Sequence, residues 1–265
     1  MLKLENISIT FNANTPDENK ALKNINLEIK KGDFITVIGS NGAGKSTLYN
    51  VIAGTLKASS GRILLSDESG EKNITNDAEY KRARYIGRIF QNPLLGTAGK
   101  MSLEDNMMIC YKKGFKGFKI SLNNKMREFF REQLKVLNMN LENRLGDNVD
   151  QFSGGQRQAL TLLMAVMSRP NLLLLDEHTA ALDPTNAQIV MDLTRRFAKE
   201  YNLTVMMVTH NMQHALDFGN RLIMMNKGEI ISDISGEEKN SLTMDSIVEL
   251  FKKIKVTNDN LMLNA

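Results

Sequence analysis

The chain has 265 residues, and 42% of them are hydrophobic, which is enough for one large domain or two small ones around a well-buried core. Lys and Arg together number 34 and Asp and Glu number 30, so the net charge of +4 is too weak and too dispersed to indicate a nucleic-acid partner. The single cysteine, Cys110, excludes an intramolecular disulfide and fits a reducing compartment.

The amino terminus reads MLKLENISITFN and has polar residues where a signal peptide needs an uninterrupted apolar stretch. No segment reaches the roughly 18 apolar residues of a membrane span. We therefore expect a soluble protein, so that any work at a membrane requires a partner.

Two amino-terminal segments alternate apolar and polar residues, which is typical of strands with one buried face. They cover residues 2–11 and 22–29 and predict a pair of antiparallel strands. The segment between them, from Asn12 to Lys20, is polar and rich in turn residues, so we expect a surface loop there.

Three short runs are almost wholly apolar, as in strands that are covered on both faces of a parallel sheet. They lie at residues 34–38, 172–175 and 205–208. Helical patterns separate them at residues 45–56, 156–167 and 187–201. Strands that alternate with helices predict an α/β fold with a doubly wound, mostly parallel sheet.

Residues from about 100 to 150 carry Glu, Lys, Asn and Met at helical spacing and contain no strand-like run. They predict a helical subdomain, over about residues 95–165, inserted into the α/β core. Within it, residues 111–120 (YKKGFKGFKI) form either a loop between two helices or a basic contact with a membrane partner or lipid headgroups. We expect the main domain to cover residues 1–235 and a polar helical extension to cover residues 236–265.

A glycine-rich segment lies between the strand predicted at residues 34–38 and the helical pattern that follows it. The segment consists of Gly39, Ser40, Asn41, Gly42, Ala43, Gly44, Lys45, Ser46 and Thr47. Its glycines let the backbone wrap closely around phosphates, and the helix amino terminus adds N–H donors and positive potential. We predict that Lys45 reaches the β- and γ-phosphates of a nucleotide and that Ser46 binds magnesium.

Two carboxylates, Asp176 and Glu177, follow the apolar run at residues 172–175. Adjacent residues at the carboxyl end of a strand point in different directions and can take different roles. We predict that Asp176 holds Mg²⁺, directly or through water, and that Glu177 orients and polarises the attacking water as the general base. Taken alone, the pair is equally typical of a solvated strand end. Downstream of a phosphate loop it indicates catalysis.

The signature segment, which comprises Ser153, Gly154, Gly155 and Gln156, opens the helical pattern at residues 156–167. A hydroxyl, bare backbone N–H groups and the helix dipole together make an anion site. An ordinary N-capped helix would explain Ser153 but not the glycine pair, which weakens a helix start. The chain is therefore predicted to carry two phosphate-binding helix starts.

These motifs, in this order, resemble those of the ABC ATPase family over residues 1–235. The signature segment is similar to the family signature. Gln91 resembles the family's Q-loop glutamine, which contacts the metal and the attacking water and relays changes toward membrane subunits. Asp183, in the sequence Ala-Leu-Asp, resembles the D-loop at the dimer contact, and His210 resembles the switch histidine that hydrogen-bonds the γ-phosphate.

Phe11 resembles the aromatic residue that stacks on adenine in this family, and it stands at the end of the first predicted strand. The alternative is that Phe11 is a core residue, because the loop after it is longer than usual. Two further departures are Phe152, where a Leu commonly precedes the signature, and His178, which we expect to shape the D-loop rather than to take part in chemistry.

The resemblance implies a P-loop NTPase core with an antiparallel β subdomain and the inserted helical subdomain. It also implies that the protein binds ATP and Mg²⁺ and hydrolyses ATP as a homodimer, in which the signature of one subunit closes over the nucleotide held by the other. The implied partners are transmembrane permease subunits and an extracellular substrate-binding protein, with no nucleic acid. The implied location is the cytoplasmic face of the cell membrane, as a peripheral protein.

The sequences DEHTAALDP and SGGQRQAL resemble those of ATPases paired with amino-acid-type permeases, including systems assigned to tryptophan or tyrosine uptake. A free-standing cassette favours an importer. Two alternatives remain open: a soluble ABC ATPase of the translation or repair type, and a nucleotide-binding regulator. The single cassette and the short insertion argue against the first, and the presence of both Glu177 and His210 argues against the second.

Overall fold

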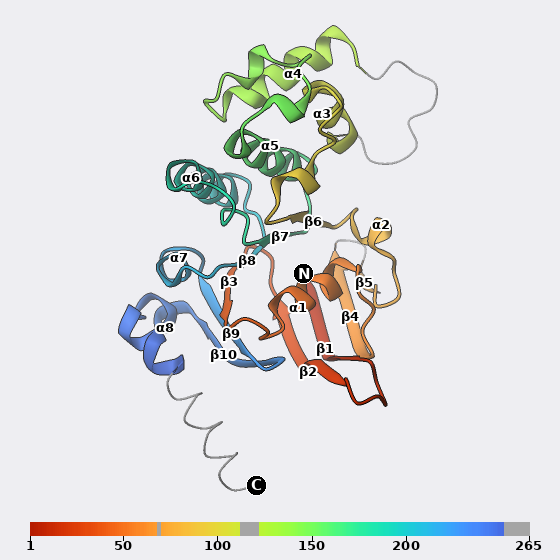
Figure 1. Cartoon of the computed structure of the whole chain (residues 1–265), viewed down its shortest axis with the longest axis vertical. Coiled ribbons are helices and arrows are strands. Elements are labelled where there is room, and N and C mark those ends of the chain that lie inside the picture. Colours follow the sequence, from red (N-terminus) through yellow and green to blue (C-terminus); the bar gives the residue numbers. More distant parts are fainter. Residues whose placement is uncertain (68–69, 112–121, 252–265) are drawn as a thin grey trace, which may run out of the picture.

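The computed structural model describes residues 1–67, 70–111 and 122–251. Two β-sheets form the body of the molecule, and helices cover the larger sheet and extend beyond it at one end (Figure 1). In the described residues the larger sheet has six strands in the order β10-β9-β3-β8-β7-β6, and the smaller has four in the order β2-β1-β4-β5.

The larger sheet is parallel except at its β10 edge, where β10 runs antiparallel to β9. Its strands are β3 (Phe34–Gly39), β6 (Ile86–Ile89), β7 (Leu172–Asp176), β8 (Val205–Val208), β9 (Arg221–Asn226) and β10 (Glu229–Ser235). The apolar runs that predicted β3, β7 and β8 are thus confirmed as strands, and so is the mostly parallel α/β fold. β6, β9 and β10 are not among the strands predicted from the sequence.

The helices around the larger sheet are α1 (Lys45–Ala53), α5 (Gly154–Met167), α6 (Pro184–Glu200) and α7 (Met212–Asp217). The short helix α2 (Glu79–Arg82) lies beside the last turn of α1, to whose carbonyls Arg82 donates. The prediction that the first helix continues to residue 56 is wrong, because Gly54 adopts a φ of 87° and its N–H bonds to the last turn of α1. The predicted start of α6 at residue 187 is also too late. Asp183 caps this helix and Pro184 occupies its first turn.

Both faces of the larger sheet are buried, which explains why its strands read as continuous apolar runs. In β7, Leu172 and Leu174 pack with residues of α1 and the smaller sheet. Leu173 and Leu175 pack in a second core with residues of α5 and α6. Because side chains two residues apart on a strand share a face, Asp176 lies on the α1 side.

The smaller sheet is antiparallel throughout. Its strands are β1 (Leu2–Phe11), β2 (Asn19–Ile29), β4 (Ser60–Asp67) and β5 (Gly70–Asn73). The two predicted amino-terminal strands are confirmed as a pair. Asn19 and Lys20 were expected in the loop but belong to β2, because they pair with Phe11 and Thr10. The exposed loop therefore covers residues 12–18.

A helical part lies at one end of the molecule, beyond the larger sheet (Figure 1). It contains α3 (Leu103–Tyr111), α4 (Asn124–Lys135), α5 and the 3-10 helices η1 (Pro93–Gly96), η2 (Leu141–Asn143) and η3 (Val149–Gln151). Met107, Phe130 and Leu163 share one buried core that joins α3, α4 and α5. These residues are helical as predicted, while the division of the chain into domains stays a prediction. Residues 112–120 of the basic segment lie outside the described residues.

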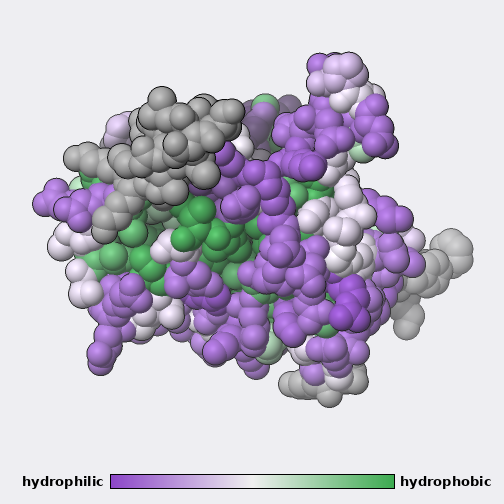
Figure 2. All heavy atoms as spheres, turned by 90° about the horizontal axis from the view of Figure 1, so that it is seen from below, coloured by the Kyte–Doolittle hydropathy of each residue, from purple (hydrophilic) through white to green (hydrophobic). Residues whose placement is uncertain are grey.

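After β10 the chain returns to the larger sheet through α8 (Gly236–Asn240) and the helical residues 244–251. Ile247 is fully buried and packs with Ile38, Ala215 and Met224. None of the helices described is both long enough and apolar enough to span a bilayer. Seen from below, the molecule presents mostly hydrophilic side chains around a central apolar area (Figure 2).

Candidate functional site

A pocket of about 820 Å³ opens beside the amino terminus of α1. Residues from Asn41 to Thr47 line it on one side, and the ends of β1 and β2 line it on another. Glu177 and His210, which follow β7 and β8, also face the pocket, as does the turn between β9 and β10. The site is thus built from segments that are far apart in the sequence.

The glycine-rich segment presents backbone N–H groups to this pocket. Gly44 has a φ of 100°, and a Cβ there would lie 2.7 Å from the Ala21 carbonyl oxygen, so only glycine fits. No side chain caps the amino terminus of α1. The N–H groups of its first turn are therefore available to an anion, which the helix dipole also favours.

Lys45 closes the segment on itself. Its Nζ donates hydrogen bonds of 2.7 Å to the Gly39 carbonyl and 3.1 Å to the Ser40 carbonyl. Burial lowers the pKa of Lys45, while the charges of Glu177 and Asp176 oppose that shift. An ammonium group that is buried, held by carbonyls and lining the pocket is suited to bind phosphate oxygens.

Glu177 and His210 meet directly. His210 Nε2 lies 2.5 Å from Glu177 Oε1, and the side chains are 49% and 17% exposed respectively. Glu177 also has a φ of 48°, a conformation that costs a non-glycine residue free energy and that is common at functional sites. The structure therefore places the predicted base and the predicted switch histidine together at the pocket wall.

The three predicted metal ligands are not all at the pocket. Ser46 is exposed and lines it. Asp176 stands at the end of β7, on the α1 side, and forms an ion pair of 3.1 Å with Arg88. Gln91 is exposed just after β6 and is not among the lining residues. Hydroxyl, carboxylate and amide oxygens are the donor types that Mg²⁺ accepts.

Phe11 is 37% exposed and lines the pocket at the end of β1. The alternative that Phe11 is a core residue is therefore wrong. Three lysines that the sequence analysis did not single out share this part of the wall: Lys20 and Lys23 on β2, and Lys227 in the β9–β10 turn. Lys20 is ion-paired with Glu18 at 3.8 Å and Lys23 with Glu229 at 3.5 Å, so the three lysines leave this side of the pocket with a small net positive charge, which attracts anions.

The turn between β9 and β10 is fixed between the glycine-rich segment and β2. Gly228 donates its N–H to the Ala43 carbonyl at 3.0 Å and accepts from the Lys23 N–H at 2.8 Å. Lys227 and Gly228 have φ values of 46° and 83°, as in a two-residue hairpin turn. The sequence Asn-Lys-Gly between two apolar segments is a signal that could have identified this hairpin.

The signature segment and Asp183 lie away from this pocket, since none of their residues lines it. Ser153 caps α5 through a capping box with Gln156, with hydrogen bonds of 3.2 and 3.1 Å. The ordinary-cap interpretation of Ser153 thus describes this state of the protein. Asp183 caps α6, and its hydrogen bonds to Asn186 lower the pKa of the Asp183 carboxyl.

The second glycine of the signature has a packing role as well. A Cβ at Gly155 would lie 2.5 Å from Asn186 Cγ and 2.8 Å from Asn186 Cβ. One at Gly154 would lie 3.5 Å from Leu182. The amino terminus of α5 therefore packs closely against the Leu182–Asp183 segment and α6 of the same chain.

A sequence model of the ABC transporter family matches residues 22–180. A "Tyrosine transport ATP-binding protein" from Clostridioides difficile (strain R20291) is 42% identical over 95% of this chain and 99% of the relative. A "Phosphonates import ATP-binding protein PhnC" from Lactococcus lactis subsp. cremoris (strain SK11) is 32% identical over 96% of this chain and 99% of the relative.

Among solved structures, a dimeric ATP-binding cassette in a post-hydrolysis state with ADP and Pi is similar, with a TM-score of 0.70 and 29% identity. The match covers 89% of this chain and 98% of that one. The pocket with its phosphate-type loop, the paired Glu177 and His210 beside it and these matches agree. The chain belongs to the ABC transporter family and is an ATP-binding, ATP-hydrolysing subunit.

Proposed function

We propose that the protein works as an Mg²⁺-dependent homodimer on the cytoplasmic face of a membrane, bound to permease subunits, and that it energises the uptake of a small solute such as an amino acid. The solute class rests on a relative named for tyrosine transport that is similar over almost its whole length. An extracellular substrate-binding protein would deliver the solute, since the chain itself takes no part in binding it.

The position of the signature segment supports the dimer. α1 packs on the face of the larger sheet that carries Leu174, and α5 packs on the opposite face with Leu173. Their amino termini therefore belong to different sides of the sheet, and the pocket contains none of Ser153 to Gln156. A second copy would bring these N–H groups to the phosphates of ATP held by the first.

Residues that line the pocket and residues on the neighbouring strands would divide the work of hydrolysis. Ser46, Asp176 and Gln91 would hold Mg²⁺, which neutralises phosphate charge when bound. Lys45 would exchange its carbonyl partners for β- and γ-phosphate oxygens. Phe11 would stack on the adenine, and the neighbouring lysines would attract the triphosphate.

The contact between Glu177 and His210 gives the base an off state. In this contact Glu177 Oε1 is occupied by the imidazole at 2.5 Å. A γ-phosphate would offer His210 another acceptor, so that Glu177 is released to take a proton from the attacking water. Asp183, at the start of α6, would lie at the dimer contact beside that water.

The region after Gln91 suits a permease contact. Leu94 and Leu95 in η1 are 56% and 65% exposed, and Ile109 on α3 is 54% exposed. Large apolar side chains that are exposed to solvent are candidates for protein–protein contacts. The closeness in sequence of Leu94 and Leu95 to Gln91 would link solute binding to the metal and the attacking water.

The variant Glu177→Gln tests the proposal. It keeps the shape of the side chain but cannot accept the proton, so we expect hydrolysis to fall at least about 100-fold while ATP binding persists. With ATP and Mg²⁺ the variant should become a stable dimer in size-exclusion chromatography with light scattering. Ser153→Glu is the control, since it should bind ATP as a monomer and fail to dimerise. The proposal would be refuted by near-normal hydrolysis in Glu177→Gln. It would also be refuted if Glu177→Gln stayed monomeric in the presence of ATP.

A further inference from the structure

Arg88 is a nearly buried cation in β6 that has no role in the hydrolysis proposed above. In the parallel pairing of β6 with β7, Arg88 lies opposite Leu174. Side chains two residues apart on a strand share a face, so Leu174 and Asp176 point to the same side. The pairing therefore places the guanidinium of Arg88 next to the carboxylate of Asp176, on the side of the sheet that faces α1.

The guanidinium joins three elements at once. Its Nη2 donates to Asp176 Oδ2 at 3.1 Å, and its Nη1 donates to Asn50 Oδ1 in α1 at 2.7 Å. Its Cζ also lies over the Phe90 ring, 4.6 Å from the centroid. The side chains of Arg88 and Asp176 are only 12% and 15% exposed, so water screens their ion pair weakly.

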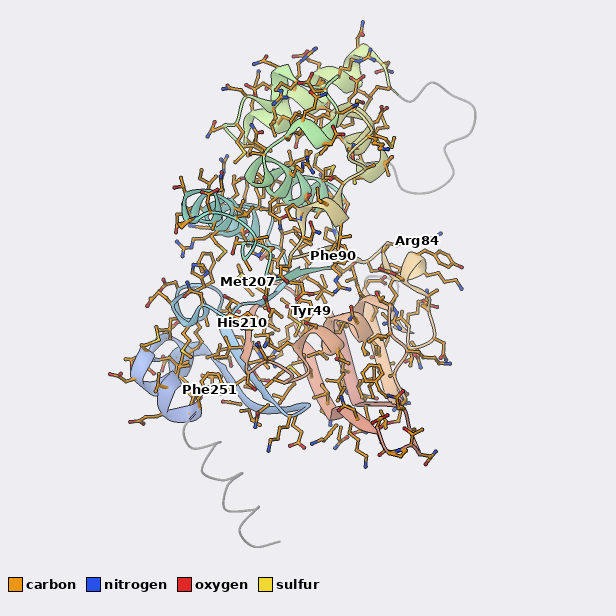
Figure 3. The ribbon with its side chains drawn as sticks, viewed as in Figure 1. Tyr49, Arg84, Phe90, Met207, His210 and Phe251 are labelled. Carbon is orange, nitrogen blue, oxygen red and sulfur yellow. The ribbon has the colours of Figure 1, made fainter. Side chains whose placement is uncertain are left out.

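The surroundings leave Arg88 as the direct partner of Asp176. Tyr49, in α1, is fully buried, and burial followed by the charge of Asp176 raises its pKa well above the usual value, so the phenol stays neutral. Lys45 donates to carbonyls of the glycine-rich segment instead. In Figure 3, Tyr49 and Phe90 both lie in the middle part of the molecule, with Phe90 on the side of the helical part.

We propose that Arg88 is a positioning residue: it holds Asp176 by Oδ2 so that Oδ1 is presented to the magnesium shell, and it ties this carboxylate to the segment that leads to Gln91. The inference rests on the proposed metal role of Asp176. Gln91 follows Arg88 by three residues on the same segment, so a displacement of Gln91 by a permease would reach Asp176 through one side chain.

The planar fork of arginine is essential to this role, because a lysine cannot bond Asp176 and Asn50 in the same geometry. A simple charge effect makes a different prediction. If Arg88 only opposed the charge of Mg²⁺, its removal would strengthen metal binding. If Arg88 positions Asp176, both a charged and an uncharged replacement of Arg88 weaken Mg²⁺ binding.

The test compares Arg88→Lys and Arg88→Met in the full chain. A fluorescent ATP analogue is titrated with Mg²⁺ and, separately, bound in EDTA, and the Mg²⁺ dependence of ATPase activity is measured in parallel. We expect both variants to need at least fivefold more Mg²⁺ for half-maximal binding and activity, and kcat to fall about tenfold. Nucleotide binding in EDTA should change less than twofold.

Asn50→Ala removes one arm of the fork and should act in the same direction but less strongly. Combined with Arg88→Lys it should add little, because both substitutions break the same bridge. Arg84→Lys is the matched control; Arg84 is exposed, precedes β6 and lies well away from His210, so its Mg²⁺ dependence should equal that of the wild type (Figure 3).

Three results would overturn the role of Arg88: an unchanged Mg²⁺ requirement in both variants, tighter Mg²⁺ binding by Arg88→Met, or a loss of nucleotide binding that is equally large in EDTA. Asp176→Asn separates this failure from failure of the proposed function. If Asp176→Asn has a normal Mg²⁺ requirement, the metal role of Asp176 is wrong. If it is impaired while the Arg88 variants are normal, only the inference about Arg88 fails.

Discussion

Glycine is required at position 155 for two reasons, of which the sequence indicates only one. The glycine pair of the signature leaves backbone N–H groups accessible, which is the reason for predicting an anion site at residues 153–156. The structure adds that Asn186 of α6 fills the space where a Cβ of Gly155 would lie. Asn186 is in turn held by Asp183, at 2.6 Å from its carboxylate. Residues assigned to the signature and to the D-loop therefore determine each other's positions within one chain.

Gly155→Ala should destabilise the protein by about 1–3 kcal/mol, although alanine is the better helix former, because the added methyl overpacks against Asn186. Urea unfolding measures this change in free energy. In an Asn186→Gly background the same substitution should cost much less, which isolates the steric term. An equal cost in both backgrounds would show that Asn186 is not the obstacle.

His178 is a buried histidine that directly follows Asp176 and Glu177 in the sequence. Its Nε2 lies 3.0 Å from Thr194 Oγ1, and Thr194 donates its own proton to the Val190 carbonyl at 2.8 Å. Thr194 therefore accepts from a protonated Nε2, which fixes the neutral tautomer. Burial, with a smaller contribution from His214, lowers the pKa of His178 to about 4. The ring anchors the Glu177–Asp183 turn to α6 and takes no proton at neutral pH.

The depressed pKa of His178 makes the stability of the nucleotide-free protein depend on pH. In the unfolded chain the pKa is close to 6.5, so between pH 6.5 and about 4 the unfolded state binds a proton that the folded state refuses. The contribution of the neutral His178 ring to stability is therefore fully present above pH 6.5, and it is lost as the pH falls from 6.5 toward 4. Between pH 7.5 and 4.5 the wild type should lose about 2 kcal/mol more unfolding free energy than His178→Gln. Parallel pH profiles of the two proteins would contradict the burial of a neutral ring.

At the scale of elements, the carboxyl terminus of α1 depends on a buried arginine from α2. Arg82 is 2% exposed and donates to the carbonyls of Val51 at 2.7 Å and Ile52 at 2.9 Å. It also donates to the carbonyls of Thr75 at 2.8 Å and Asp77 at 3.0 Å. One side chain thus donates to carbonyl groups in the last turn of α1 and joins the helix to the segment after the smaller sheet.

Arg82→Met should lower the free energy of unfolding by about 3 kcal/mol or more, because several buried carbonyls lose their donor while the apolar volume is kept. Chemical denaturation measures the loss. The matched control is Lys81→Met on the same helix, an exposed position where the change should stay within about 0.5 kcal/mol. Similar effects at the two positions would mean that the carbonyls find other donors.

The elements that the sequence predicted are those whose pattern is local. β3, β7 and β8 are continuous apolar runs because both faces of the sheet are covered. β6 reads Ile-Gly-Arg-Ile and escapes the pattern, because the charge of Arg88 is satisfied by Asp176 and Asn50, partners that only the fold brings near. The β9–β10 hairpin carried a turn signal, but its lysine at positive φ is unusual for such a turn.

The residues of the candidate site also fall into two groups, those that belong to a local sequence pattern and those that only the fold brings together. The glycine-rich segment, Glu177 and His210 belong to contiguous motifs, and the structure brings them to one pocket. The lysines on its other wall come from β2 and the β9–β10 turn, and no local pattern distinguishes them from ordinary surface lysines. Their assignment needs the pairing of distant strands.

For the molecule as a whole, the exposed apolar residues beside Gln91 predict how the subunit meets its membrane partner. Leu94→Asp combined with Leu95→Asp should abolish copurification of permease subunits from native membranes, because both side chains are more than half exposed and apolar. ATP hydrolysis by the isolated subunit should remain within about twofold. Ile231→Asp, on the β10 edge, is a control that should leave copurification intact. Permease recovered equally with the double variant would place the contact elsewhere.

The described carboxy-terminal residues belong to the body of the protein. Ile247 packs on Ile38, directly before the glycine-rich segment, and Phe251 lines a small cavity of about 180 Å³ together with Gly39, Ser40 and His210. The segment thus supports the strand that leads into the glycine-rich segment. Changes in this helix should therefore affect the positions of the glycine-rich segment and of His210.

The hydrogen bonds from Lys45 to the carbonyls of Gly39 and Ser40 have a calorimetric consequence. The loop is already folded around the ammonium group, so ATP enters a preorganised site. On binding, Lys45 exchanges its two carbonyl acceptors for phosphate oxygens. Little chain has to be ordered when the nucleotide binds to a single subunit. The heat capacity change of that step should therefore be small, and a large negative change should appear only when two loaded subunits close and bury their surfaces.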